Sequence, residues 1–409
     1  MAGAPSRAWD RSLAGRSLPD LGRAIGSLRR ALKLYARGER DRARRLLTDS
    51  AILLRVPAPD LPRLDQALAL RGPPSRPTRP LAAAADVIVP VYNSSEHLRR
   101  LLATLFERTD ERHRILLADD GSTEPAVARL LAAAAARPNV RLVGTAANRG
   151  FIATVNAAMA ETTGDAVVLN SDTEVPPGWL DRLLQPIEQD ATVASTTPFS
   201  NAAQIFSVPV PDRDHALPPD LDVAAVDAAF ARLRPDPGSE LEAPTAIGFC
   251  MGISRRAWQA VGPFDAEAFG RGYCEETDWC LRARAAGWSN RLVPNLFVFH
   301  THGGSFADRE RKALLERNLA TLHRRWPDYY RRLADFRRRD PWRCYRSAAL
   351  LALAAEAGGV SGKIELRRVA GRTILEARRG QWHARLLASE ADSRDAVLRA
   401  LDAGADSPG

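Results

Sequence analysis

Short apolar runs alternate with amphipathic segments from residue 86 to about residue 200. Residues 94–106 place leucines at spacings of three and four, which is the period of a helix, whereas the apolar runs between such segments have the length of strands. The expected strands cover residues 86–91, 114–118, 139–143 and 165–169. This alternation is typical of βαβ units and predicts an α/β fold with a mostly parallel sheet flanked by helices.

The N-terminal region predicts a helical hairpin. Apolar residues recur there at helical spacing, at Leu21, Ile25, Leu28, Leu32 and Tyr35. A second helix is expected over residues 40–54, after a break at Gly38. Residues 72–80 are rich in proline and predict a stiff linker. We therefore place a basic N-terminal appendage with its linker at residues 1–80.

The end of the chain predicts a small α+β tail. The expected elements are a helix over residues 347–357, a strand meander over residues 363–387 and a helix over residues 392–401. We place the central domain at residues 81–335 and a C-terminal appendage of unknown role at residues 336–409. Residues 200–245 show poor periodicity and predict a long, partly mobile loop region.

Composition and charge narrow the functional class. The chain has 409 residues, of which 45% are hydrophobic and 26% charged, as in a globular protein. Residues 1–80 carry 17 Lys+Arg against 7 Asp+Glu, a net charge of +10, so the other 329 residues sum to −1 within the total of +9. The excess of basic charge is thus confined to the N-terminal appendage, which argues against nucleic acid as a partner. The hairpin arginines are either a solvated surface or, over residues 20–55, a docking site for an anionic membrane.

The cysteines and the hydropathy predict the compartment. Cys250, Cys274, Cys280 and Cys344 form no C-x-x-C pair, which argues against a structural zinc site and fits a reducing cytosol. No run approaches the ~18 apolar residues that span a bilayer. We expect a cytoplasmic protein whose membrane contact is peripheral, at the inner face of the cell membrane.

Acidic side chains follow two of the expected strands. Asp119-Asp120 ends one strand and Asn170-Ser171-Asp172 ends another, and parallel α/β sheets bind ligands at this edge. These residues are either turn and cap residues or a site for a metal and a nucleotide diphosphate. Neither a Gly-rich dinucleotide loop nor a Walker loop occurs, so side chains and a metal must hold the nucleotide. Tyr92 offers an aromatic face to a base and Asp120 an acceptor for a uracil or thymine imino proton, whereas Asp172 suits Mg²⁺ or Mn²⁺.

A series of motifs in this order resembles the family 2 glycosyltransferases over roughly residues 84–330. They are Val89-Pro90-Val91-Tyr92-Asn93, Asp119-Asp120-Gly121-Ser122, Asn148-Arg149-Gly150-Phe151, Leu169-Asn170-Ser171-Asp172, Gly248-Phe249-Cys250-Met251-Gly252, Gly262-Pro263-Phe264-Asp265, Gly272-Tyr273-Cys274-Glu275-Glu276-Thr277-Asp278 and His300-Thr301-His302-Gly303-Gly304-Ser305-Phe306. The resemblance implies a Rossmann-like GT-A fold and inverting transfer of a sugar from a nucleotide diphosphate donor.

The resemblance also implies residue roles. Asp172 corresponds to the metal-binding aspartate, although Asn170 stands where many members have a second one. His300 is either an additional metal ligand or a structural histidine. From the acidic pair we choose Glu276 as catalytic base over Glu275, and expect only one of the two to face the cleft. The expected nucleotide-sugar ligands are Pro90, Tyr92, Asn93, Asp120, Asn148, Arg149, Asn170 and Ser171.

The expected activity is hexosyl or deoxyhexosyl transfer from a UDP- or dTDP-sugar to a growing cell-surface polysaccharide or glycolipid. The motifs resemble the branch that includes rhamnosyl- and galactofuranosyl-type transferases. Two alternatives stay open at this point: a catalytically silent scaffold, supported by Asn170, and a docking protein that acts through its basic hairpin.

Overall fold

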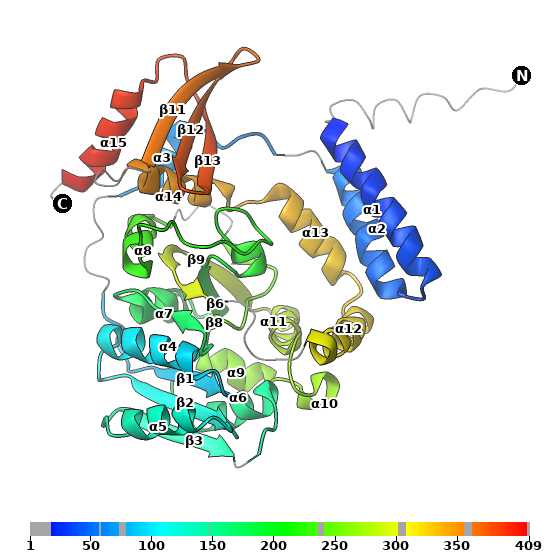
Figure 1. Cartoon of the computed structure of the whole chain (residues 1–409), viewed down its shortest axis with the longest axis vertical. Coiled ribbons are helices and arrows are strands. Elements are labelled where there is room, and N and C mark those ends of the chain that lie inside the picture. Colours follow the sequence, from blue (N-terminus) through cyan, green and yellow to red (C-terminus); the bar gives the residue numbers. More distant parts are fainter. Residues whose placement is uncertain are drawn as a thin grey trace, which may run out of the picture. The chain divides into compact units, whose positions relative to one another are not determined.

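The computed structural model describes residues 18–56, 59–72, 79–145, 147–235, 241–301, 308–355 and 362–406. The chain divides into two compact units (Figure 1). The helical unit comprises Met1–Asp60 with Glu316–Pro341, and the sheet unit comprises Leu61–Leu315 with Trp342–Gly409.

An eight-stranded sheet, in the order β3-β2-β1-β4-β8-β6-β9-β7, is the centre of the sheet unit. Its strands are β1 (Asp86–Val91), β2 (Arg114–Asp120), β3 (Val140–Thr145), β4 (Ala166–Leu169), β6 (Val193–Phe199), β7 (Glu242–Ala243), β8 (Cys250–Ile253) and β9 (Ser289–Phe297). Four of the seven pairings are parallel, and β8 runs antiparallel to both of its neighbours. The predicted mostly parallel α/β fold is confirmed.

Helices flank this sheet. They are α4 (Ser95–Arg108), α5 (Pro125–Ala134), α6 (Phe151–Ala160), α7 (Trp179–Gln189), α9 (Arg255–Val261), α10 (Ala266–Phe269) and α11 (Glu275–Ala285). The leucine stripe expected over residues 94–106 is buried in α4, where Leu98, Leu101 and Leu105 are fully covered. Burial of such a stripe contributes about 1.5–3 kcal/mol per leucine and holds the helix on the domain.

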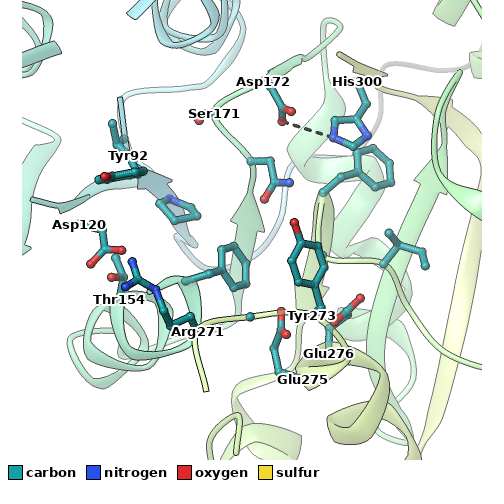
Figure 2. Close-up of a pocket in the computed structure, with 18 of the residues that line it drawn as sticks. Tyr92, Asp120, Thr154, Ser171, Asp172, Arg271, Tyr273, Glu275, Glu276 and His300 are labelled. Atoms are coloured by element: carbon teal, nitrogen blue, oxygen red, sulfur yellow. Dashed lines mark ion pairs between the residues drawn. The ribbon is translucent and has the colours of Figure 1, made fainter. Parts of the chain in front are cut away.

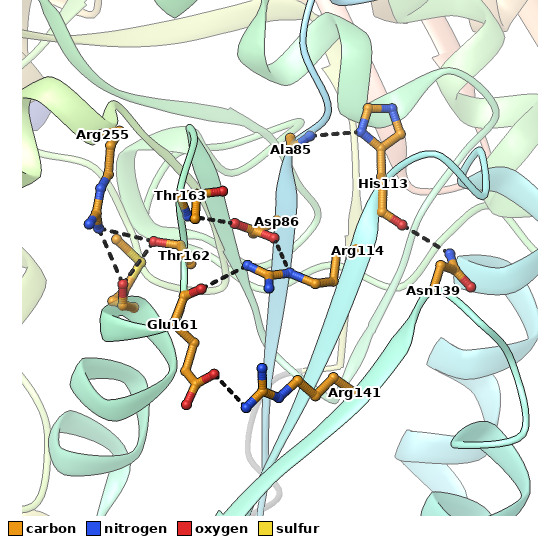
Figure 3. Close-up of polar contacts among 11 residues, drawn as sticks. Ala85, Asp86, His113, Arg114, Asn139, Arg141, Glu161, Thr162, Thr163 and Arg255 are labelled. Carbon is orange, nitrogen blue, oxygen red and sulfur yellow. Dashed lines mark hydrogen bonds and ion pairs between the residues drawn. The ribbon is translucent and has the colours of Figure 1, made fainter.

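A polar network fixes the amino ends of the first strands (Figure 3). The Arg114 guanidinium donates to Asp86 at 2.7 Å and to the carbonyl of Glu161 at 2.8 Å. The Glu161 carboxylate pairs in turn with Arg141 of β3 at 2.8 Å. These bonds tie β1, β2, β3 and the end of α6 together, at the edge opposite to the strand ends that carry Asp120 and Asn170.

The described residues of the region 200–245, which are 200–235 and 241–245, are packed, and the expectation of a loop region is corrected for them. They include η1 (Gln204–Phe206) and α8 (Val223–Ala231), and Phe206 and Phe230 are fully buried. Asp227 of α8 forms a buried ion pair with Arg182 at 2.7 Å and accepts the N–H of Phe297 at 2.8 Å. These bonds join residues that are far apart in the sequence, so sequence periodicity could not predict them.

The predicted C-terminal meander is present, but it shares its core with the sheet. It consists of β11 (Gly362–Val369), β12 (Arg372–Arg379) and β13 (Trp382–Ala388), with α14 (Arg343–Ala355), α15 (Arg394–Asp406) and α3 (Leu64–Ala69) packed around it. Trp342 is fully buried against Phe199 and Phe206, with ring centroids 6.3 and 4.9 Å away. Trp382 donates to the Ala216 carbonyl at 2.8 Å.

The helical unit contains the predicted hairpin, α1 (Leu18–Ala36) and α2 (Arg40–Arg55), with α13 (Tyr329–Arg339) packed on α2. The later part of α12 (Asp308–Arg325) also belongs to this unit. The units therefore divide the chain differently from the expected boundaries after residues 80 and 335, because α3 packs on α14 and β13 whereas α13 packs on α2. Among the residues with described structure, no helix is both long and apolar enough to cross a membrane.

Candidate functional site

A pocket of about 280 Å³ opens at the carboxyl ends of β1, β2 and β4 in the sheet unit (Figure 2). Strand ends from distant parts of the chain meet there because the three strands are parallel neighbours, with Val91 opposite Asp119 in register. Ten of the twelve predicted site residues line the pocket: Pro90, Tyr92, Asp120, Asn148, Asn170, Ser171, Asp172, Glu275, Glu276 and His300.

The other two, Asn93 and Arg149, do not line it. The Asn93 amide oxygen accepts the N–H groups of Thr123 at 2.8 Å and Glu124 at 3.1 Å, so this side chain shapes the loop after β2. The Arg149 side chain is exposed, whereas its main-chain N–H reaches Asp120 at 2.6 Å. The two residues therefore support neighbouring parts of the site and do not face its interior.

Asp120 lies at one end of the pocket with Tyr92, Thr154 and Arg271 (Figure 2). Its buried carboxylate accepts the N–H of Gly150 at 2.9 Å as well as that of Arg149. Gly150 has a φ of +93°, and a Cβ there would lie 2.8 Å from the Cα of Arg271, so only glycine fits. The carboxylate is thus held in one orientation, and each of its oxygens keeps a lone pair for a ligand.

Asp172 and His300 face each other at the opposite end, with 3.3 Å between Oδ1 and Nε2 (Figure 2). A two-stranded ribbon brings them together, because β5 (Thr173–Glu174) pairs antiparallel with β10 (Phe299–His300). The N–H of Thr301 donates to the Asp172 carbonyl at 2.8 Å and continues this pairing. Two short segments far apart in the sequence thereby place the Asp172 carboxylate beside the His300 imidazole.

The His300 ring is fixed by bonds from behind. Its Nδ1 lies 2.7 Å from the Ala202 carbonyl, which can only accept, so Nδ1 carries a proton and Nε2 points toward Asp172. Asn201 binds both the N–H and the carbonyl of His300, at 2.9 and 3.0 Å, and Phe249 stacks on the ring at 5.1 Å. Burial disfavours a charged imidazole, but the hydrogen bond and the charge of Asp172 outweigh it and raise the pKa of His300.

This donor pair fits a divalent cation. Two ligands about 2.1 Å from one cation lie roughly 3 Å apart when they are adjacent, close to the observed 3.3 Å between Asp172 and His300. A histidine ligand usually donates its other ring N–H to a carbonyl, as His300 does to Ala202. Across the described ranges no cluster of three or more His, Cys, Asp or Glu side chains is arranged to hold a metal. Mg²⁺ and Mn²⁺ accept few protein ligands when substrate phosphates supply the rest.

The first turn of α11 supplies two buried carboxyl groups. Glu275 and Glu276 both line the pocket, and the Oε2 atom of each is buried without a hydrogen-bond partner. The prediction that only one of them faces the cleft is therefore wrong. The end of the helix points at the pocket, and side chains tilt toward a helix N-terminus, so residues on different faces of the first turn reach the same space.

Burial and the contact between the two carboxyl groups shift the pKa of each. Burial is the largest cause in both cases and raises the pKa of Glu275 and of Glu276. The charge of Glu276 raises the pKa of Glu275 further, whereas a hydrogen bond from Glu275 favours the ionised form of Glu276. The interaction between the two groups thus favours a proton on Glu275 more than on Glu276.

A strained turn precedes these glutamates. Gly272, Tyr273 and Cys274 all have positive φ angles, of 152°, 70° and 73°, and such values are costly for the two non-glycine residues. Packing of α11 holds the turn in place, since Trp279 is buried and donates to the Gly262 carbonyl at 2.9 Å. Asp278 pairs with Arg282 at 2.9 Å, and the Arg282 guanidinium also donates to the Val261 carbonyl at 2.7 Å.

Arg271, Thr154 and Gln204 are among the polar pocket residues that sequence reasoning missed. Arg271 lines the pocket and binds the side-chain oxygen of Asn148, and Thr154 presents a buried hydroxyl without a partner. Their positions in the sequence could have identified both, because Arg271 lies four residues before Glu275 and Thr154 lies four residues after Gly150, in or beside the motifs quoted above. Gln204, from the region without periodicity, carried no such signal.

Comparisons with known proteins agree with this geometry. The family model described as "Glycosyl transferase family 2" matches residues 86–262. The N-acetylglucosaminyl-diphospho-decaprenol L-rhamnosyltransferase of Mycobacterium tuberculosis is 31% identical over 235 residues, which cover 52% of this chain and 75% of that protein. The chain belongs to glycosyl transferase family 2. It is a glycosyltransferase that acts on a sugar donor, with the GT-A-type fold expected for the family.

Two further likenesses are more limited. The undecaprenyl-phosphate 4-deoxy-4-formamido-L-arabinose transferase of Sodalis glossinidius is 36% identical over 117 residues, covering 27% of this chain and 36% of that protein. Among solved structures, the mannosyltransferase PcManGT from Pyrobaculum calidifontis in complex with GDP-Man and Mn²⁺ is 19% identical. That likeness has a TM-score of 0.44 and covers 84% of this chain and 87% of the other.

Proposed function

We propose that this protein transfers a hexosyl or deoxyhexosyl group, with inversion, from a UDP- or dTDP-sugar to a hydroxyl group of a lipid-linked glycan. The observation that carries the proposal is one pocket with three chemically distinct parts: the Asp120 end, the Asp172–His300 pair and the buried Glu275–Glu276 pair. A nucleotide-sugar has three matching parts, namely the base, the diphosphate and the reacting sugar.

The Asp120 end would bind the nucleoside. Asp120 accepts the imino N–H of uracil or thymine, and Tyr92 offers an aromatic face to the base. Arg271 takes the role first expected of Arg149, because its guanidinium faces the pocket and donates to acceptor atoms of the donor substrate. The Thr154 hydroxyl supplies a further hydrogen bond.

The Asp172–His300 pair would hold Mg²⁺ or Mn²⁺ together with the diphosphate oxygens. Bound there, the cation supplies Lewis-acid stabilisation of the departing diphosphate. Asn170, which stands in place of an aspartate, lies in the same turn, with its N–H bonded to the Phe249 carbonyl at 2.8 Å. The protein then relies on one carboxylate and one imidazole as its own ligands.

Glu276 would act as the catalytic base. The acceptor hydroxyl attacks the anomeric carbon as the bond from that carbon to the diphosphate breaks, and the hydroxyl proton passes to the Glu276 carboxylate. A proton held on Glu275 would favour the ionised form of Glu276, because two buried carboxylates in contact cannot both carry charge cheaply. This charge state supports the choice of Glu276 over Glu275.

The relatives support a lipid-linked acceptor, since the names of two of them contain decaprenol and undecaprenyl phosphate. We extend the proposal to a cytoplasmic site of action, peripheral at the inner face of the cell membrane, where such acceptors are reached from the aqueous side.

Product formation with matched variants tests the function. UDP- and dTDP-sugars are incubated with Mn²⁺ and polyprenyl-diphosphate-linked acceptors, and the stereochemistry of the product is read by NMR. Glu276→Gln should lower kcat by about 10²–10⁴ while leaving donor binding intact, and the wild-type product should have the inverted anomeric configuration. Wild-type turnover in Glu276→Gln, or retention of configuration, would overturn the mechanism; donor binding without any transfer would favour a silent scaffold.

A further inference from the structure

Helix α1 of the helical unit carries an apolar stripe that the fold leaves in solvent. Its members Ile25, Leu28, Leu32 and Tyr35 are 45%, 45%, 63% and 60% exposed, and their spacings of three and four place them on one face of the helix. Four of the seven large hydrophobic residues that are exposed in the described part of the chain belong to this stripe. Such a concentration on one face marks an interaction surface rather than ordinary surface variation.

The hairpin itself explains why the stripe is free. Helix α1 packs on α2 through small residues, and Ala24, Ser27 and Ala31 are 3%, 8% and 1% exposed. Ala43 and Ser50 are the buried residues on the α2 side. At 100° per residue, the centre of this small-residue face lies about a quarter of a turn away from the stripe. The apolar residues that predicted an amphipathic helix are therefore not the residues that the hairpin buries.

Cations border the apolar stripe. Residues 18–56 carry ten Lys+Arg against four Asp+Glu, and Arg29 and Lys33 follow two of the stripe leucines directly and are exposed. The Arg40 guanidinium lies over the Tyr35 ring, 5.8 Å from its centroid. An apolar face with basic residues along its border is the composition of helices that lie in the plane of an anionic membrane.

We propose that α1 docks on a bilayer surface containing anionic lipids, with the stripe inserted among the acyl chains and the basic side chains at the headgroups. Long basic side chains suit this position, because their stems lie along apolar surface while the charge stays at the polar boundary. A second copy of the chain fits less well, since the stripe spans about three turns, less than the three to four heptads that a coiled coil needs. The proposal goes beyond sugar transfer and rests on the helical unit alone.

Vesicle co-sedimentation of the full chain tests the surface. Vesicles of phosphatidylcholine mixed with phosphatidylglycerol should bind the protein, those of phosphatidylcholine alone far less, and added salt should weaken the binding. The double variant Leu28→Ser, Leu32→Ser should bind about a hundredfold more weakly, at roughly one order of magnitude for each inserted leucine. Leu142→Ser is the matched control, because Leu142 of β3 is also 45% exposed and lies outside the stripe.

Both variants replace exposed side chains, so circular dichroism should show unchanged helix content. Equal binding of the double variant and wild type, or binding that ignores the anionic lipid, would overturn the proposal. So would a wild-type dimer in light scattering that the double variant abolishes, because a second copy would then cover the stripe. Glu276→Gln should still bind vesicles, so loss of transfer and loss of docking are separable.

Discussion

At the residue scale, Arg271 and Arg149 allow an arginine that lines the pocket to be compared with one that lies outside it. Both side chains are exposed, but Arg271 lines the pocket beside Asn148 whereas Arg149 does not line it. Arg271→Ala should weaken binding of a UDP- or dTDP-sugar by about 10- to 100-fold, the usual loss for a hydrogen bond to a charged group. Arg149→Ala is the matched control and should change it little. Equal losses in calorimetric titrations of the two variants would disprove this assignment.

The buried carboxyl pair predicts a pH-dependent stability. The pKa of Glu275 is raised in the folded protein above its ordinary value of about 4.3, so its contribution is fully present below that value and is lost as pH rises through the raised pKa. Glu275→Gln removes this dependence. The melting temperature of the variant relative to wild type should therefore increase from about pH 5 to about pH 8. A difference that stays constant over this range would show that Glu275 is not held neutral.

At the element scale, strand and helix patterns predicted four of the eight strands of the sheet, and with them the Asp120 and Asp172 positions, because buried parallel strands and amphipathic helices have distinct periods. β6 escaped prediction, since its buried side chains include Ser195, Thr196 and Thr197, whose partners lie elsewhere in the fold. The β5–β10 ribbon, with two residues in each strand, is too short to leave a periodic signal.

The ribbon nevertheless sets the geometry of the proposed metal site, and Asn201 is its support. Asn201→Ala removes both side-chain bonds to the main chain of His300 and should weaken Mn²⁺-dependent donor binding by about 10- to 100-fold. Asn156→Ala provides the control, because Asn156 binds both main-chain groups of Phe264 in the same way, at 2.8 and 3.1 Å, without lining the pocket. If titrations with Mn²⁺ show the same loss for both variants, general destabilisation rather than His300 orientation is responsible.

At the scale of the whole molecule, the C-terminal residues belong to the core of the sheet unit. Sequence patterns identified the meander but not its docking, because Trp342 and Trp382 reach partners more than a hundred residues away. Contacts between residues so far apart leave no local pattern in the sequence. Short-range periodicity accordingly predicted individual elements but not the long-range contacts between them.

Removal of the Trp342 side chain should therefore destabilise the entire sheet unit. Trp342→Ala should lower the free energy of unfolding by about 3–5 kcal/mol, the usual cost of emptying a fully buried tryptophan site. Trp288→Ala, at a half-buried position, should cost less. Urea unfolding followed by circular dichroism measures both. If Trp342→Ala unfolds like wild type, the C-terminal region is an independent appendage after all.

Metal-dependent donor binding tests the central claim most directly. Thermal shifts of the wild type and of Asp172→Asn are measured with UDP- and dTDP-sugars, with and without Mn²⁺, because a ligand that binds only the folded state raises its melting temperature. We predict a shift for the wild type that needs both donor and Mn²⁺ and that Asp172→Asn largely loses. An equal shift in Asp172→Asn, or a wild-type shift that is indifferent to Mn²⁺, would contradict the proposal that Asp172 and His300 hold the cation at the donor diphosphate.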